Sequence, residues 1–199
     1  MEATRRQGSY SRETSETKVA VSWVVEGTGE CRVATGIGFL DHMLAQLAKH
    51  GDFDLEVTAR GDLQVDQHHT VEDVAIALGR ALDSALGDRL GLARMGDALV
   101  PLDEALARVA VDLGGRGYAV VEADLSEIGA GELRGDMVKH FLRSFAAEGR
   151  FTLHADVLRG EGDHHKIEAL FKALARALRE ACQIDPRRRG TVPSTKGVV

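Results

Sequence analysis

Hydrophobic and polar residues alternate in several short segments of the chain, and this period of two is typical of strands that bury one face. In residues 19–25 the alternation places Val19, Val21 and Trp23 on one side. We expect residues 1–12 to be mobile. The alternating pattern predicts further strands at residues 53–62, 107–113, 118–125 and 150–158.

Other segments space their hydrophobic residues by three and four, as amphipathic helices do. Residues 39–51 have this spacing, and Gly51 is placed to end the helix as its C-terminal cap. Similar spacing predicts helices at residues 71–86, 138–149 and 167–178. The two halves of the chain therefore share one order of strands and helices.

A histidine motif repeats together with these elements. The sequence HHxxE at residues 68–72 returns at residues 164–168, each time beside a helical segment rich in Ala and Leu. His42 and His140 stand at matched distances before a Gly-x-Phe sequence. Self-similarity over so long a period indicates two copies of one supersecondary unit rather than a solenoid of short repeats.

We therefore predict an α+β fold of two duplicated half-domains, each a β-sheet with two helices packed on one face. The first half-domain covers residues 1–92 and the second residues 93–186, and a polar tail follows at residues 187–199. The chain has 199 residues, of which 44% are hydrophobic, so it can bury a core as one compact domain or as two small halves sharing one.

The charge pattern narrows the class of partner. The formal net charge is −6 with acidic and basic residues interspersed, which provides neither a basic stripe for nucleic acid nor a polybasic cluster for a membrane. We therefore expect a small-molecule partner. Cys31 and Cys182 lie far apart and outside any CxxC spacing, which predicts neither a disulfide framework nor a thiolate zinc site. Since no apolar leader or span is present, we expect a soluble, cytoplasmic protein.

Helix geometry indicates which of the repeated groups can share a metal ion. Side chains four residues apart lie on one face of a helix, whereas adjacent side chains diverge by about a hundred degrees. His68 can therefore share a metal with Glu72, and His164 can share one with Glu168. The second histidine of each pair points elsewhere.

If the two halves face each other, each of these pairs can take a crossing histidine from the other half. His42 and His140 then complete two similar ligand sets, each of three imidazoles and one carboxylate. Such nitrogen and oxygen donors suit manganese, iron, zinc or cobalt and leave coordination positions open for a substrate. The sequence predicts a centre with two metal ions.

Two other functions are compatible with such a centre. A dinuclear phosphoester hydrolase would use bridged metals to activate water, but it typically needs several aspartate ligands, whereas this set is rich in imidazole. A metal-storage or di-iron bundle protein needs long uninterrupted helices. The 22 glycines and the strand-like segments oppose that reading.

The chain resembles the imidazoleglycerol-phosphate dehydratases over roughly residues 12 to 197, in segments that include FLDHML, DQHHTVEDVAIALG, HFLRSFA, HHKIEALFKALARAL and PSTKG. The resemblance implies a tandem of two units similar to the second domain of ribosomal protein S5. It implies dehydration of D-erythro-1-(imidazol-4-yl)glycerol 3-phosphate to 3-(imidazol-4-yl)-2-oxopropyl phosphate in L-histidine biosynthesis, through a metal-bound imidazolate and a diazafulvene-like intermediate. It also implies two Mn²⁺ ions per active site and no organic cofactor.

The same resemblance assigns the metal ligands. One manganese ion would be held by His42, His69, His164 and Glu168, and the other by His68, Glu72, His140 and His165. The ligands would converge at subunit contacts within a homo-oligomer, a shell of 24 subunits, so that a monomer would lack a complete site.

The resemblance further suggests residues that contact the substrate. Glu16 is the expected acid/base, with His50, Asp103 and the metal carboxylates Glu72 and Glu168 as other candidate proton carriers. Expected contacts to the phosphate or the pocket come from Gln46, His50, Arg94, Arg116, Lys172, Ser194, Thr195 and Lys196.

Overall fold

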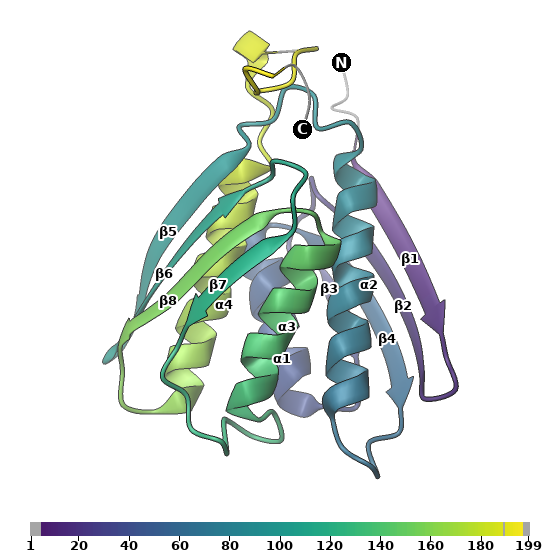
Figure 1. Ribbon diagram of the computed structural model, residues 1–199, viewed down its shortest axis with the longest axis vertical. Coiled ribbons are helices and arrows are strands. Elements are labelled where there is room, and N and C mark those ends of the chain that lie inside the picture. Colours follow the sequence, from purple (N-terminus) through teal and green to yellow (C-terminus); the bar gives the residue numbers. More distant parts are fainter. Residues whose placement is uncertain (1–4, 189, 197–199) are drawn as a thin grey trace.

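The computed structural model describes residues 5–188 and 190–196. These residues form two four-stranded sheets and four α-helices, and the helices lie between the two sheets (Figure 1). None of the helices in this part of the chain is both long and apolar enough to cross a membrane.

The first half of the chain forms a sheet with the strand order β1-β2-β4-β3. β1 and β4 pair antiparallel with β2, and β3 pairs parallel with β4. The elements in chain order are β1 (Gln7–Glu13), β2 (Thr17–Val24), β3 (Cys31–Ala34), α1 (Gly38–Gly51), β4 (Asp54–Gly61) and α2 (His68–Leu86).

The second half repeats this topology with the order β5-β6-β8-β7, and β7 again pairs parallel with β8. The duplicated α+β fold that the repeat predicts is thereby confirmed. The boundary predicted between residues 92 and 93 lies in the connection from α2 to β5. The elements are β5 (Met95–Leu102), β6 (Ala105–Asp112), β7 (Tyr118–Glu122), α3 (Gly135–Glu148), β8 (Thr152–Arg159), α4 (Asp163–Ala181) and a 3₁₀ turn, η1 (Pro186–Arg188).

Helices of the two halves pack on one another, α1 on α4 and α2 on α3, while each also covers a strand of its own half. One hydrophobic core therefore runs through both halves. Trp23 of β2 is fully buried and stacks on Phe145 of α3 with ring centroids 5.9 Å apart. Phe145 in turn meets Phe151 at 5.1 Å. The halves thus share a single core.

Three strands, β1, β3 and β5, are not indicated by the hydrophobic pattern, and the expected mobility of residues 1–12 is wrong for the part that forms β1. β1 packs on α2 through its backbone, since a Cβ at Gly8 would lie 2.0 Å from the carbonyl oxygen of Ala81. In the second half, a Cβ at Gly96 would lie 2.3 Å from the carbonyl oxygen of Ala177. Strands that approach a helix this closely carry glycine in place of a large apolar side chain.

Gly51 does not cap α1 as predicted, because the left-handed residue that ends this helix is the next one, Asp52, with φ 53°. In α3 the capping residue is Gly149, with φ −78°, and the left-handed residue Arg150, with φ 52°, follows it. Glycine is required for space instead. A Cβ at Gly51 would lie 2.2 Å from the Phe53 ring, and one at Gly149 would lie 2.7 Å from the Phe151 ring.

The contact between α2 and α3 depends on Gly79. A Cβ there would lie 2.6 Å from the backbone nitrogen of Gly149 and 2.8 Å from the carbonyl oxygen of Phe145. In an open helix, Gly→Ala would stabilise by about 1 kcal/mol. We expect Gly79→Ala to lower the free energy of unfolding instead, by about 1–3 kcal/mol, because backbone atoms cannot move aside. Urea unfolding at a fixed protein concentration measures this.

Gly38→Ala is the matched control, since its Cβ would meet only the Glu132 side chain, at 3.6 Å. That variant should unfold at the same urea concentration as the wild type or a higher one. A Gly79→Ala protein as stable as the control would contradict the close approach of the two helices.

Candidate metal centre

Histidine and glutamate side chains from two packed helices meet at the start of α2. His68 and Glu72 lie one turn apart on α2, and His140 of α3 reaches across so that its Nε2 lies 3.2 Å from Glu72 Oε1. The ligand atoms of the three residues lie within 4.8 Å of one another. We call this group the α2–α3 cluster.

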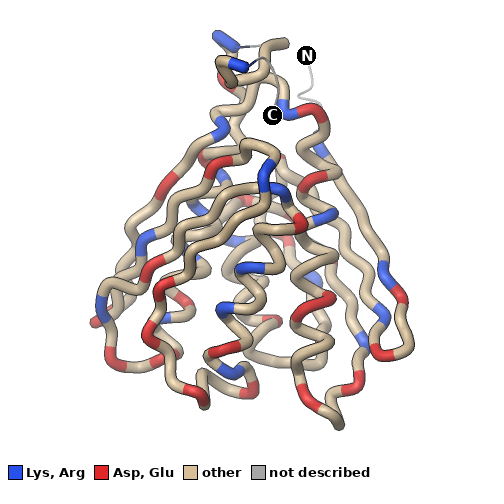
Figure 2. Tube along the Cα trace, in the orientation of Figure 1, with Lys and Arg blue, Asp and Glu red and all other residues tan. Residues whose placement is uncertain are grey.

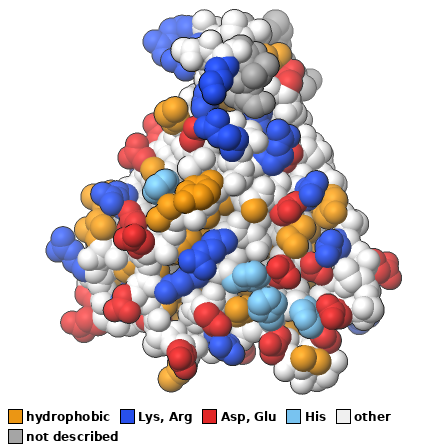
Figure 3. Space-filling view, in the orientation of Figure 1, with side chains coloured by type: hydrophobic (Ala, Val, Ile, Leu, Met, Phe, Trp, Pro, Cys, Tyr) orange, Lys and Arg blue, Asp and Glu red, His pale blue; other side chains and the backbone are white. Residues whose placement is uncertain are grey.

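A matching group, the α1–α4 cluster, forms where α1 packs on α4. His42 of α1 and His164 of α4 each place Nε2 at 3.2 Å from Glu168 Oε2. Their ligand atoms also lie within 4.8 Å of one another. The Phe39 ring packs edge-on against His164, with centroids 5.0 Å apart. Figure 3 shows histidine side chains gathered on one part of the surface.

Each cluster takes a His/Glu pair from one half and a single histidine from the other half, as helix geometry predicts. The cause is the packing of first-half helices on second-half helices. The two nitrogen donors and one carboxylate oxygen of each cluster are a donor set that binds first-row divalent ions. That the clusters bind metal stays a prediction.

The carboxylate of Glu168 is held in its charged form. Burial raises the pKa of this group, but hydrogen bonds from Lys172 and His42 outweigh burial and lower the pKa to about 2. Lys172 Nζ lies 2.6 Å from Glu168 Oε1. An anionic oxygen is therefore available near both histidines at neutral pH.

The remaining two histidines of the repeated motif lie outside both clusters. His69 places Nδ1 3.1 Å from Asp62 Oδ2 and 3.7 Å from Glu16 Oε2. His165 places Nδ1 2.7 Å from Glu104 Oε2. Each set of four ligands that the resemblance implies thus has three members together in one chain and a fourth elsewhere in it.

Two residues expected in the substrate pocket lie on α1, one and two turns beyond His42. Gln46 Oε1 lies 3.1 Å from His50 Nε2. Partial burial, together with the charge of Lys172, lowers the pKa of His50, which favours its neutral form. Gln46, His50 and Lys172 therefore border the α1–α4 cluster.

The other expected phosphate contacts are not brought to either cluster within one chain. Arg94 binds Asp112 and donates to the carbonyl oxygen of Pro193 at 2.6 Å, which fixes the segment that contains Ser194, Thr195 and Lys196. This segment lies at the end of the molecule opposite to the start of α2 and α4 (Figure 1), where several basic residues gather (Figure 2). Residues 189 and 197–199 of the predicted tail lie outside the described residues. Arg116 is exposed, with no ion pair in the described part of the chain.

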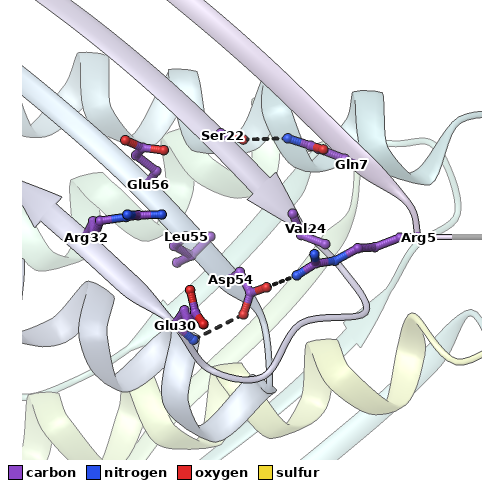
Figure 4. A pocket seen from close by; sticks show the side chains of 9 residues that line it. All are labelled: Arg5, Gln7, Ser22, Val24, Glu30, Arg32, Asp54, Leu55 and Glu56. Atoms are coloured by element: carbon purple, nitrogen blue, oxygen red, sulfur yellow. Dashed lines mark hydrogen bonds and ion pairs between the residues drawn. The ribbon is translucent and has the colours of Figure 1, made fainter.

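A polar pocket on the outer face of the first sheet does not qualify as the site (Figure 4). Asp54 lines this pocket, and its carboxylate already accepts hydrogen bonds from the Arg5 side chain and from the backbone nitrogens of Thr28 and Glu30. The pocket contains no histidine and lies on the side of the sheet away from the helices.

Sequence reasoning missed Asp73, which follows Glu72 and is 6% exposed. Asp73 accepts a hydrogen bond from Thr17 and pairs with Arg12 at 2.7 Å. It thereby anchors on α2 the β1–β2 hairpin that carries Glu16. A carboxylate on the buried face of an amphipathic helix was the available signal.

A family model described as imidazoleglycerol-phosphate dehydratase matches residues 35–178. A curated protein of that name from Chloroflexus aurantiacus is 56% identical over 98% of this chain and 95% of its own length. The solved structure of the dehydratase from Pyrococcus furiosus, in complex with (S)-C348, is similar with a TM-score of 0.82 and 36% identity, over 96% of this chain and all of that one. The structure from Staphylococcus aureus has a TM-score of 0.81 and 35% identity, over 90% and 99% of the two chains.

The charged state of Glu168 predicts a pH dependence of stability in metal-free protein. Because its folded pKa of about 2 lies below the ordinary 4.5, its contribution is present above pH 4.5 and is lost as the pH falls toward 2. We expect Glu168→Gln to be less stable than the wild type at pH 5, with the difference shrinking by pH 2.5. Urea unfolding in the presence of a chelator measures both values.

Glu122→Gln provides the control, since Glu122 is exposed and has no ion pair among the described residues. It should differ little from the wild type at either pH. A Glu168→Gln deficit that grows on acidification would contradict the assigned charge state.

Proposed function

Because this chain belongs to the imidazoleglycerol-phosphate dehydratase family and is a hydro-lyase of histidine biosynthesis, we propose that its dehydration reaction depends on two divalent metal ions. The observation that supports this most directly is the pair of clusters, in each of which two imidazoles and one carboxylate place ligand atoms within 4.8 Å. We propose Mn²⁺ as the metal. The substrate would be D-erythro-1-(imidazol-4-yl)glycerol 3-phosphate and the product 3-(imidazol-4-yl)-2-oxopropyl phosphate.

The α1–α4 cluster would hold one ion and the α2–α3 cluster the other. When bound, the ions would supply Lewis acidity to the imidazole ring of the substrate and help to orient it. Three protein ligands leave coordination positions free in each cluster. His69 of a neighbouring chain would be the fourth ligand of the α1–α4 cluster, and His165 of a neighbouring chain would be the fourth ligand of the α2–α3 cluster.

We also propose that the active site forms only in a homo-oligomer, which the resemblance suggests has 24 subunits. Two placements support this. His69 and His165 lie outside the clusters of their own chain, and the segment with Ser194, Thr195 and Lys196 lies at the opposite end of the molecule. Neighbouring chains would then supply both the fourth histidine and this segment to a given cluster.

We also propose a cytoplasmic location. It fits a biosynthetic enzyme of this kind, and it fits the two cysteines, Cys31 and Cys182, which form no disulfide.

Glu16 is the proposed proton carrier. Its carboxylate lies 3.7 Å from His69, and its side chain is half exposed, so a substrate can reach it. The hydroxyl group would leave C1 and Glu16 would take the proton from C2, and this proton and the departed hydroxide together make one molecule of water. The resulting enol then becomes the ketone. The anchor that Asp73 provides holds the hairpin of Glu16 in place.

Basic and hydroxyl side chains would hold the phosphate at the unreactive end of the substrate. Lys172 already lies beside the α1–α4 cluster, bound to Glu168. A neighbouring chain would contribute Arg94, Arg116, Ser194, Thr195 and Lys196. The guanidinium group of an arginine can donate two parallel hydrogen bonds to two oxygens of a phosphate. Gln46 and His50 would line the same pocket.

Removal and return of metal tests the proposal. Protein dialysed against a chelator should lose dehydratase activity, and Mn²⁺ should restore most of it, with the ketone product as the readout. Folding and assembly are followed by circular dichroism and light scattering. Full activity in protein shown to be metal-free would refute the metal dependence. Phosphate release from simple esters instead of ketone formation would favour a dinuclear hydrolase.

Glu16→Gln tests the proton carrier. We expect kcat to fall by about 10²- to 10⁴-fold, the range of general acid–base catalysis, with the bound metal unchanged. Glu13→Gln is the matched control on the same hairpin, because Glu13 is exposed and its one ion pair within the described residues is with Lys18, at 3.0 Å. Near-normal kcat in Glu16→Gln, or an equal loss in Glu13→Gln, would remove Glu16 from this role.

A further inference from the structure

The two histidines outside the clusters are held in the same way. His69 has Nδ1 at 3.1 Å from a carboxylate oxygen of Asp62, and His165 has Nδ1 at 2.7 Å from one of Glu104. In both rings Nε2 makes no hydrogen bond among the described residues, and the nearest carboxylate to that of His165 is the exposed Asp103, with Oδ2 at 4.0 Å. The Nε2 atoms of His42, His140 and His164 approach the carboxylates of the clusters.

The two carboxylates come from positions that do not correspond in the repeat. Asp62 follows β4, at a position that Gly160 occupies after β8, and glycine offers no carboxylate. Glu104 instead lies in the turn between β5 and β6. Glu16 holds the matching place in the turn between β1 and β2 and lies 3.7 Å from His69. A carboxylate from this turn therefore faces the second histidine of the motif in both halves, and Asp62 is a further carboxylate that only the first half has.

Glu104 is itself fixed in place. Its Oε1 accepts hydrogen bonds from the backbone nitrogens of Glu161 and Gly162, each at 3.3 Å, while Oε2 faces His165. The side chain links the β5–β6 turn to the segment that enters α4.

A carboxylate on one ring nitrogen of a histidine fixes the tautomer and the rotation of the ring, and it makes the other nitrogen a better metal ligand. The His69 and His165 side chains are 34% and 40% exposed, so each ring is open to another molecule while one edge is held.

We infer that Asp62 and Glu104 are positioning residues, which hold His69 and His165 with Nε2 directed to a metal ion in a cluster of a neighbouring copy of this chain. The inference rests on the proposed metal function. It adds two residues that act through histidine and that do not touch the metal or the substrate.

Metal affinity measured apart from activity tests the inference. Equilibrium dialysis with elemental analysis gives the number and affinity of Mn²⁺ ions per subunit, and the electron paramagnetic resonance spectrum reports their surroundings. We expect Glu104→Ala and Asp62→Ala each to lower the affinity for one of the two Mn²⁺ ions by about 10- to 100-fold and to leave the affinity for the other unchanged. Glu104→Gln and Asp62→Asn, which keep an acceptor oxygen, should lie between Ala and the wild type.

Double variants identify the ion that each residue serves. Glu104→Ala should cause little further loss of affinity in a Glu72→Gln background, because both changes would weaken binding of the ion in the α2–α3 cluster. Combined with Glu168→Gln, it should lower the affinity for both ions. Asp62→Ala should show the opposite pattern. The controls are Glu122→Gln and Asp97→Asn, two exposed carboxylates that form no ion pair among the described residues.

Circular dichroism and light scattering check folding and assembly of every variant, and the Gln and Asn variants decide if an Ala variant does not fold. Wild-type affinity for both ions in the folded variants would overturn the positioning role while the proposed function stands. Equal losses in the two controls would overturn it as well. A wild-type protein that binds no divalent ion would instead refute the proposed metal function and, with it, this inference.

Discussion

The packing of α1 on α4 and of α2 on α3 determines which functional groups meet in this protein. Within each half, the helices cover that half's own sheet, but their other faces pack on helices of the other half. His42 and His140 are therefore carried to the glutamates of the opposite half, at 3.2 Å in each case. Neither half could assemble a cluster by itself. The duplication is thus functional because of how the copies dock.

This docking depends on small residues at the points of closest approach. Gly79 lets α2 reach the backbone at the end of α3, and Gly8 and Gly96 let the first strand of each half lie directly on a helix. Large aromatic side chains fill the space between these contacts, as Trp23 and Phe145 do. Close-packed interiors tolerate little change in volume, so the distances in the clusters are set by the whole core and not by the histidines alone.

The proposed binding of metal would be linked to assembly. In each cluster, one chain brings together three of the four expected ligands. The fourth ligand, His69 or His165, and the segment with Ser194, Thr195 and Lys196 lie outside the clusters of that chain. A ligand that binds only the assembled state stabilises that state by mass action. Metal and subunit contacts would then reinforce each other, and the carboxylates that hold His69 and His165 would reduce the ordering needed when chains meet.

The sequence by itself determined the duplication, the helices, most of the strands, and the pairing of His68 with Glu72 and of His164 with Glu168. These features follow from periodicity, which is a property of neighbouring residues along the chain. Only the tertiary structure revealed β1, β3 and β5 and the anchor at Asp73. β1 and β5 approach a helix through glycine, and β3 is only four residues long. Only the tertiary structure decided that His69 and His165 face Asp62 and Glu104, since these contacts join residues from different elements. Local spacing fixes the direction of a side chain on its own helix, but the partner it meets depends on how distant elements pack.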